Sequence, residues 1–244
     1  MGHRVTTLNV NTIEPAGATL TIGADGDSVV IGNNDIRANT YKDAGGNTLF
    51  TSNGSGVLSS VNSGFSDSLK LLSTQTASNS ASISFTSGIT SAYKEYIFKF
   101  ININPATDNI DFAFQVNTVG GSGFNETITS TFFYTYMNEG DGSNSGVEYH
   151  TGVDQAQGTS YQFITYDQGN AADESASGEL HLFNPASTTY VKNFYSRMSY
   201  THYAEHFEES YAAGYINTTS AIDEISFKFA SGNFDGKIKM YGVL

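Results

Sequence analysis

The feature that most constrains the fold of this chain is an alternation of apolar and polar positions with a period of two. In the run 96–103, Tyr96, Phe98 and Phe100 fall on one side of an extended chain. Such a period is typical of a β-strand that buries one face. A turn-forming Asn-Pro segment separates this run from the next one, 111–116, so we expect the two runs to form a β-hairpin.

Runs of the same kind recur through the rest of the chain and are separated by turn-forming residues. They predict further strands at 82–86, 128–137, 160–166, 178–183, 190–200, 222–229 and 237–243. The chain contains 15 Tyr and 17 Phe residues, and only 14% of its residues are charged, a composition that favours strands over helices. We therefore predict an all-β chain in which residues 69–244 form an antiparallel β-sandwich head of jelly-roll or immunoglobulin-like type.

The first part of the chain, residues 1–68, has a different pattern. It contains only three aromatic residues, and its apolar residues occur in short groups separated by Gly, Asn and Asp. These groups are Val5/Leu8/Val10, Leu20/Ile22, Val29/Ile31, Leu49 and Val57/Leu58/Val61. Strands this short cannot bury a core of their own, so we expect an attachment stem in which several copies of the chain share one core. A disordered linker is the alternative.

The charge of the chain argues against several classes of function. The 11 Lys and Arg residues stand against 24 Asp and Glu residues, and the net charge of -13 opposes binding to nucleic acid. No segment approaches the ~20 apolar residues of a membrane span, and no apolar secretion signal follows Met1. The chain has no Cys, so disulfides and thiolate metal sites are excluded. We expect a chain made and folded in a cytoplasm, without membrane insertion.

One short segment carries a pattern known from metal-dependent enzymes. His202, Glu205 and His206 match H-x-x-E-H, in which two His residues on a helix bind zinc and the Glu is the general base. The preceding residues alternate as a strand, so the helix that this chemistry requires is not expected. We interpret the two His residues as part of a strand end or loop. We predict no catalytic residue, no bound metal and no other cofactor.

Two Asp- and Gly-rich segments, 24–28 and 138–144, offer oxygen atoms of the kind that calcium prefers. Neither completes an EF-hand loop, and Asp-Gly is also a preferred sequence of tight turns, so we interpret segment 24–28 as a tight turn between stem strands; calcium binding at either segment stays open. The G-x-S-x-G pattern of serine hydrolases is absent. The 24 acidic residues are too many for a glycosidase pair to be recognised from sequence.

Tyr residues on loops are common platforms for sugars and partner proteins, because their rings are rigid and amphipathic. The candidates are Tyr136, Tyr149, Tyr166, Tyr203 and Tyr211. Packing at strand ends or between subunits is the alternative role for these rings.

Several segments of the chain resemble virion structural proteins of marine bacteriophages. At the N-terminus these are Val10–Pro15 and Thr19–Gly23, and in the second part they are Tyr93–Phe100, Gly214–Ile222 and Gly236–Val243. The resemblance covers nearly the whole chain and implies a homotrimeric virion appendage, such as a tail fibre. It supplies no catalytic or ligand-binding residue.

Three functions are compatible with these observations. The first is a tail fibre or receptor-binding appendage, whose N-terminal region attaches to other virion proteins and whose head loops bind a glycan or protein of the host surface. The second is a capsid decoration or cement protein, sometimes called a head fibre. The third is a spike that degrades host polysaccharide, which we rank last because no catalytic pattern supports it. The chain is expected to be non-enzymatic, trimeric and located in the virion.

Overall fold

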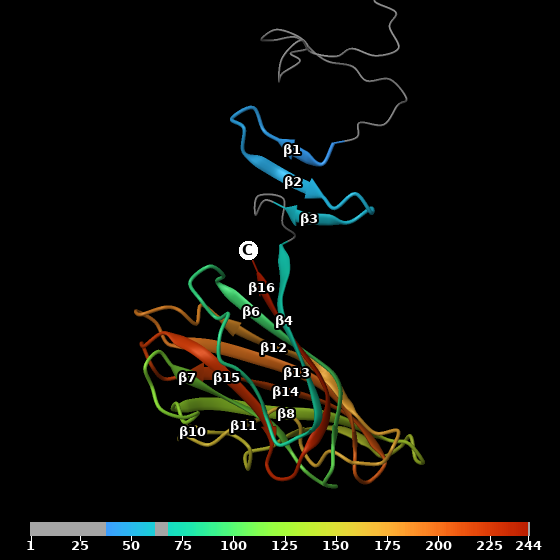
Figure 1. Cartoon of the computed structure of the whole chain (residues 1–244). Coiled ribbons are helices and arrows are strands. Elements are labelled where there is room, and N and C mark those ends of the chain that lie inside the picture. Colours follow the sequence, from blue (N-terminus) through green and yellow to red (C-terminus); the bar gives the residue numbers. More distant parts are fainter. Residues whose placement is uncertain (1–37, 62–67, 244) are drawn as a thin grey trace, which may run out of the picture. The chain divides into compact units, whose positions relative to one another are not determined.

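The computed structural model describes residues 38–61 and 68–243. The chain divides into two compact units, 1–65 and 66–244, which are considered separately below. All regular structure in the described residues is β-strand, and every pair of neighbouring strands is antiparallel (Figure 1). The prediction of an all-β chain is therefore confirmed.

The N-terminal unit contains one small sheet. Its strands β1 (Thr40–Lys42), β2 (Thr48–Ser52) and β3 (Leu58–Val61) are paired in that order. The turn between β1 and β2 is closed by Asn47, whose backbone N–H and side-chain amide both donate to the Asp43 carboxylate. Strands β2 and β3 coincide with two of the predicted apolar groups. The earlier groups, between Val5 and Ile31, lie outside the described residues.

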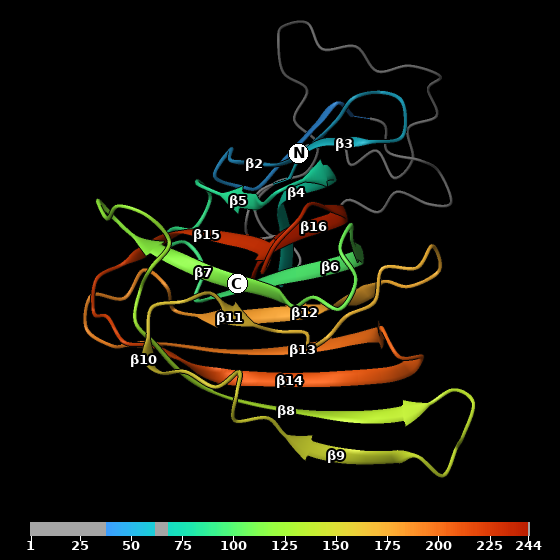
Figure 2. The same cartoon turned by 90° about the horizontal axis from the view of Figure 1, so that it is seen from below.

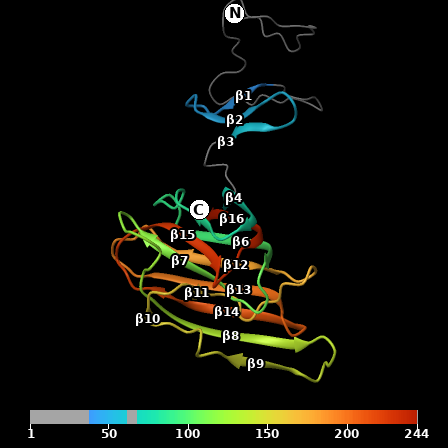
Figure 3. The same ribbon diagram turned by 60° about the horizontal axis from the view of Figure 1, so that its bottom comes forward.

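The C-terminal unit consists of two antiparallel sheets (Figures 2 and 3). The larger sheet has the order β10 (Ala156–Gly158), β8 (Ile128–Asn138), β14 (His206–Ile216), β13 (Lys192–His202), β12 (Ala176–Phe183), β6 (Glu95–Pro105), β16 (Phe234–Val243) and β4 (Leu69–Ser80), and β9 (Ser145–Tyr149) also pairs with β8. The smaller sheet has the order β11 (Gln162–Phe163), β7 (Phe112–Thr118), β15 (Ile222–Phe229) and β5 (Ile83–Phe85).

An aromatic core holds the two sheets together. Phe227, on the smaller sheet, lies 5.3 Å from the ring of Phe98 and 5.2 Å from that of Phe100, both on the larger sheet. All three side chains are buried. Phe112 and Phe229 extend the same cluster within the smaller sheet. The alternating aromatic residues of the sequence thus form the buried faces of two sheets packed as in a β-sandwich.

The predicted hairpin between runs 96–103 and 111–116 is wrong. The first run is β6 in the larger sheet and the second is β7 in the smaller sheet, so the segment between them crosses from one sheet to the other. The reason is that both runs carry aromatic residues that must face the same core. Phe100 and Phe112 satisfy this by packing edge to face across the core, with ring centroids 5.5 Å apart, instead of side by side in one sheet.

The two sheets differ in extent, and this leaves one end of the larger sheet without a facing strand. Strands β8, β13 and β14 have 11 residues each, whereas β7 has 7 and β11 has 2. In Figure 2 the ends of β8, β13 and β14 extend past β7 and β11. Loop residues cover part of this end; the Tyr166 ring, for example, stacks on Tyr134 at 5.9 Å. The inner face of the larger sheet is therefore accessible there.

Candidate functional site

The H-x-x-E-H segment lies at this accessible end and forms a β-hairpin. His202 is the last residue of β13, His206 is the first residue of β14, and the two are paired directly across the strands. Side chains at paired positions point to the same face of a sheet. The two imidazole rings are accordingly nearly parallel, with centroids 5.3 Å apart. The expectation of a strand end and turn, in place of a helix, is confirmed.

Glu208, which the H-x-x-E-H pattern does not include, joins the two His residues. It lies two positions beyond His206 on β14 and therefore points to the same face. Its side chain is 2% exposed and accepts a hydrogen bond of 2.8 Å from the Tyr200 hydroxyl. Glu205, the general base of the zinc-peptidase pattern, is instead an exposed residue of the turn with φ 58°. The arrangement is thus not that of an inverted zinc peptidase.

These residues line a cleft of about 240 Å³. Its lining combines aromatic rings, imidazoles, carboxylates and one amide, which belong to Tyr134, Tyr136, Asn144, Glu148, His202, His206 and Glu208. Strand register brings them together, because β14 pairs with β13 on one side and with β8 on the other, and β8 pairs with β9. Among the described residues that line the cleft there is no Lys or Arg.

Burial without a cation shifts the titration of the groups in the cleft. Burial raises the pKa of Glu208 to about 7 against the hydrogen bond from Tyr200, and the nearby carboxylates of Asp167 and Glu148 raise it further. Burial lowers the pKa of His202, although Asp167 acts in the opposite direction. Burial also raises the pKa of Tyr134, whose hydroxyl donates to the Glu148 carboxylate at 3.0 Å. Burial thus favours the uncharged forms of Glu208 and His202.

The loop next to the hairpin adds a second pair of acidic side chains. Asp111 accepts a 2.7 Å hydrogen bond from the backbone N–H of Asp167, and burial raises the pKa of Asp111 to about 6. The Asp167 carboxylate lies 3.8 Å from Nε2 of His202. Beside it, burial and the Asp167 charge raise the pKa of Tyr166 to about 12. The whole end of the unit is therefore polar and acidic, unlike the aromatic core.

The five Tyr residues singled out in the sequence divide between two places. Tyr136 lines the cleft, Tyr166 stacks on Tyr134 beside it, and Tyr203 is an exposed residue of the β13–β14 turn. Tyr149 and Tyr211 lie on the opposite, outer face of the larger sheet, at positions paired with Phe133. Only the first three are placed to contact a molecule in the cleft.

Of the two Asp- and Gly-rich segments, only 138–144 is among the described residues, where it forms a hydrogen-bonded turn. Segment 24–28 lies outside those residues. Segment 138–144 is the turn between β8 and β9, in which the Asn138 side chain accepts the backbone N–H groups of Gly140 and Asp141. The Asp141 carboxylate accepts both the N–H and the hydroxyl of Ser143. These oxygen atoms stabilise the turn.

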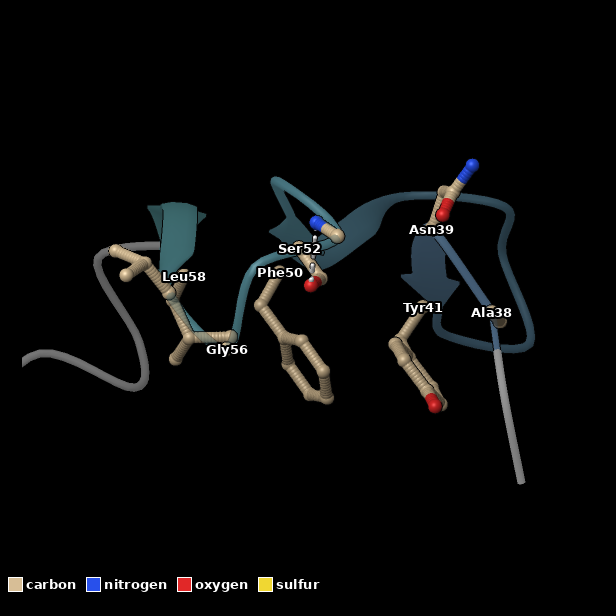
Figure 4. Close-up of a pocket in the computed structure, with 9 residues that line it drawn as sticks. Ala38, Asn39, Tyr41, Phe50, Ser52, Gly56 and Leu58 are labelled. Carbon is tan, nitrogen blue, oxygen red and sulfur yellow. Dashed lines mark hydrogen bonds between the residues drawn. The ribbon is translucent and has the colours of Figure 1, made fainter. Parts of the chain in front are cut away.

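The N-terminal unit has a shallow hollow of its own, about 640 Å³ in volume (Figure 4). Tyr41 and Phe50 project into it side by side, with rings stacked at 4.5 Å. Val57 and Leu58 complete an apolar lining. The residues that line the hollow, as far as the structure describes them, include no Asp, Glu, His, Lys or Arg.

The outer face of the larger sheet near its β9 edge is unusually apolar. Side chains that are at least a third exposed there are Phe133, Met137, Val147, Tyr149 and Phe207. The Phe133 ring stacks on Tyr211 at 4.9 Å. A contiguous apolar patch on a sheet face is typical of a contact surface.

Comparison with known proteins gives no relative from which a function could be transferred. No protein-family model, no curated protein and no solved structure matches the chain. Within residues 38–61 and 68–243 no helix has the length and apolar character needed to cross a membrane. Inferences about function therefore rest on the cleft and on the sequence pattern.

Proposed function

We propose that this chain is a non-enzymatic attachment protein whose C-terminal unit binds a glycan of a host surface in the cleft at the end of β8, β13 and β14. The observation that carries the proposal is the composition of that cleft. The Tyr136 ring lines the cleft together with the carboxylate of Glu148 and the imidazole of His206, and the mostly buried Tyr134 also contributes to the lining. Sugars present apolar ring faces and hydroxyl groups together, and this combination of side chains is complementary to both.

The charge of the cleft narrows the class of ligand. Its carboxylates accept hydrogen bonds from sugar hydroxyls, and its lining holds no Lys or Arg that would pair with a sulfate or uronate group. A neutral or amino-substituted glycan therefore fits better than an acidic one. The net charge of -13 acts in the same direction, because it repels polyanions at long range.

The experiment is a binding assay of the full chain on host bacteria and on a panel of neutral, amino and acidic glycans. Tyr136→Ala and Glu148→Gln are each expected to weaken binding by about tenfold or more, since each removes a direct contact in the cleft. Tyr190→Ala is the matched control, because Tyr190 is 69% exposed in the loop before β13, at the strand end opposite His202. Unchanged binding in both cleft variants, or release of reducing ends from the glycan, would contradict the proposal.

The proposed oligomeric state and location of the chain rest on its resemblance to phage virion proteins and are part of the same proposal. The chain acts as a homotrimer in a virion assembled in the host cytoplasm, with its N-terminal region attached to other virion proteins. The exposed apolar residues Val57 and Leu58 of the small N-terminal sheet support a core shared between copies. The jelly-roll or immunoglobulin-like assignment of the head stays a prediction.

A second candidate, capsid decoration, is favoured by the apolar outer face of β8, β9 and β14. Such a face suits a permanent contact between proteins better than a reversible contact with a hydrated sugar. Antibody labelling of intact particles separates the two candidates. Label confined to the tail supports host attachment, and label distributed over the capsid supports decoration.

A further inference from the structure

Three potential metal ligands converge on one point of the cleft. His202 and His206 are cross-strand partners, and Glu208 follows His206 on the same face of β14. One ligand atom from each lies within 4.8 Å of the other two. This is the one group of three or more such side chains with this spacing in the part of the chain that the structure describes.

The backbone holds these side chains in place independently of any bound ion. Both strands are internal to the larger sheet, since β13 lies between β12 and β14 and β14 lies between β13 and β8. The hairpin turn is closed by a 3.0 Å hydrogen bond from the Glu205 N–H to the His202 carbonyl. Two ligands of a tetrahedral zinc ion lie about 3.4 Å apart, so the three ligand atoms need to approach one another by only about 1–1.5 Å to coordinate a single ion.

The donor set selects the type of metal. Two imidazoles and one carboxylate match catalytic or exchangeable zinc sites, in which a fourth position is open to water or an external ligand. Calcium prefers oxygen ligands throughout, and two of the three groups here offer nitrogen. The surroundings favour a cation as well, because Glu148 lines the same cleft and Asp167 lies 3.8 Å from His202.

We propose that His202, His206 and Glu208 bind a divalent transition-metal ion, preferentially zinc, at the accessible end of the larger sheet. The site differs from the zinc-peptidase pattern, because Glu208 is the third ligand and Glu205 takes no part. It also stands independently of the proposed glycan binding, since the ligand set comes from the hairpin geometry alone. An ion there has its open position toward the cleft, where water or a hydroxyl group of a ligand completes the coordination.

The hydrogen bonding of His202 gives the proposal a specific signature. Nδ1 of His202 accepts a 3.0 Å hydrogen bond from the Ala204 N–H, so in the metal-free state the ring proton is on Nε2. Coordination through Nε2 moves that proton to Nδ1, and the Ala204 N–H loses its acceptor. Zinc binding is therefore expected to change both the tautomer of His202 and the amide resonance of Ala204 in NMR spectra.

The test is zinc titration of the full chain, purified without an added His tag and treated with a chelator. We expect one zinc ion per chain with a dissociation constant of about 1 μM or tighter, and no displacement by calcium. His206→Ala and Glu208→Gln are each expected to weaken binding at least about tenfold. His150→Asn is the matched control, because His150 lies outside the cluster and Asn can still accept the Gly152 N–H that Nδ1 of His150 accepts.

The possible results of the titration distinguish binding at His202, His206 and Glu208 from binding elsewhere. Zinc binding that survives in the double variant of His202 and His206, or that His150→Asn also abolishes, would contradict the site. Failure of the wild type to bind zinc at about 1 mM would do the same. X-ray absorption of the wild-type complex needs no variant, and two imidazole ligands with oxygen in the first shell are expected. No glycan or host cell is used, so loss of this site and loss of the proposed function are distinguishable.

Discussion

Replacement of Asp111 by Asn is expected to stabilise the protein at neutral pH and to leave it almost unchanged at acid pH. Asp111 is mostly buried between β6 and β7, and burial raises its pKa from 3.8 to about 6. A raised pKa means that the folded protein holds the proton more tightly than the unfolded chain does. The stabilising contribution of this proton is therefore complete below about pH 4 and is lost as the pH rises through about 6.

The expected change in the free energy of unfolding follows from the change in the pKa of Asp111. A change in pKa from 3.8 to about 6 corresponds to about 3 kcal/mol, at about 1.36 kcal/mol for each pH unit. Asn is neutral at every pH, and its side-chain oxygen can still accept the 2.7 Å hydrogen bond from the Asp167 N–H. Asp111→Asn should therefore increase the free energy of unfolding by up to about 3 kcal/mol at pH 8, relative to wild type.

The assay is urea unfolding at several pH values, followed by tyrosine fluorescence because the chain contains no Trp. The informative quantity is the difference in unfolding free energy between variant and wild type, since other groups titrate equally in both. Asp141→Asn is the control: its pKa is lowered by hydrogen bonds from Ser143, so its difference should have the opposite sign. A difference for Asp111→Asn that is constant from about pH 4 to about pH 8 would refute the reasoning.

Three further predictions concern packing and assembly. Phe227→Ala should lower the free energy of unfolding, measured in urea, by about 3–5 kcal/mol. Replacement of the exposed Phe133 by Ala should lower it by less than about 1 kcal/mol. Equal effects of the two substitutions would show that the aromatic core is misassigned. Gly178→Ala should lower the free energy of unfolding by about 1–3 kcal/mol, because the added Cβ would meet the Arg197 carbonyl of the neighbouring strand. A urea unfolding midpoint equal to that of the wild type would contradict this contact. If the N-terminal unit is a shared stem, its unfolding midpoint should rise over about a hundredfold range of chain concentration, and a constant midpoint would count against sharing.

The strands that could be predicted from sequence are mainly those whose buried face carries several aromatic residues in alternation. Strand β15 coincides with the predicted run 222–229, and β6 extends the run 96–103 by only a few residues. The pairing of these strands could not be predicted in the same way. Alternation shows which face of a strand is buried, but both sheets of a sandwich bury faces against one core. The sheet to which each strand belongs depends on contacts between residues distant in sequence.

Strand β14 was not predicted, and its side chains explain why. On its inner face are His206, Glu208 and Ser210, whereas Phe207 and Tyr211 lie on the outer face. The apolar residues thus point away from the core at this end, which is the reverse of the pattern used to recognise strands. The hydrogen-bond ladder with β13 and β8 runs along the whole strand and holds it in the sheet although its apolar side chains face outward at this end.

The site was predictable only in part, for the same reason. The H-x-x-E-H pattern drew attention to two of the His residues, and Tyr136 was among the Tyr candidates. Tyr134, Glu148 and Glu208 carried no recognisable signal, because they reach the cleft through the register of β8, β9 and β14. Of these, only Glu208 is near the pattern, and its role becomes visible once His202 and His206 are known to lie in strands with a period of two.

The position of the polar residues is itself an argument for function. Burial of the Glu208 carboxyl, which raises its pKa to about 7, and of the Asp111 carboxyl, which raises its pKa to about 6, opposes their charged forms, and each accepts a hydrogen bond that an apolar residue could not. Phe98, Phe100 and Phe227 are fully packed in the core, and buried polar side chains such as Lys192 and Ser130 also occur on inner faces away from the cleft. What distinguishes the accessible end is that its polar side chains are ionisable carboxylates and imidazoles brought together by strand register, a combination typical of binding sites. Glu208→Leu is therefore expected to abolish zinc binding in the cleft, as measured by zinc titration, while it leaves the buried Tyr200 hydroxyl without its carboxylate acceptor.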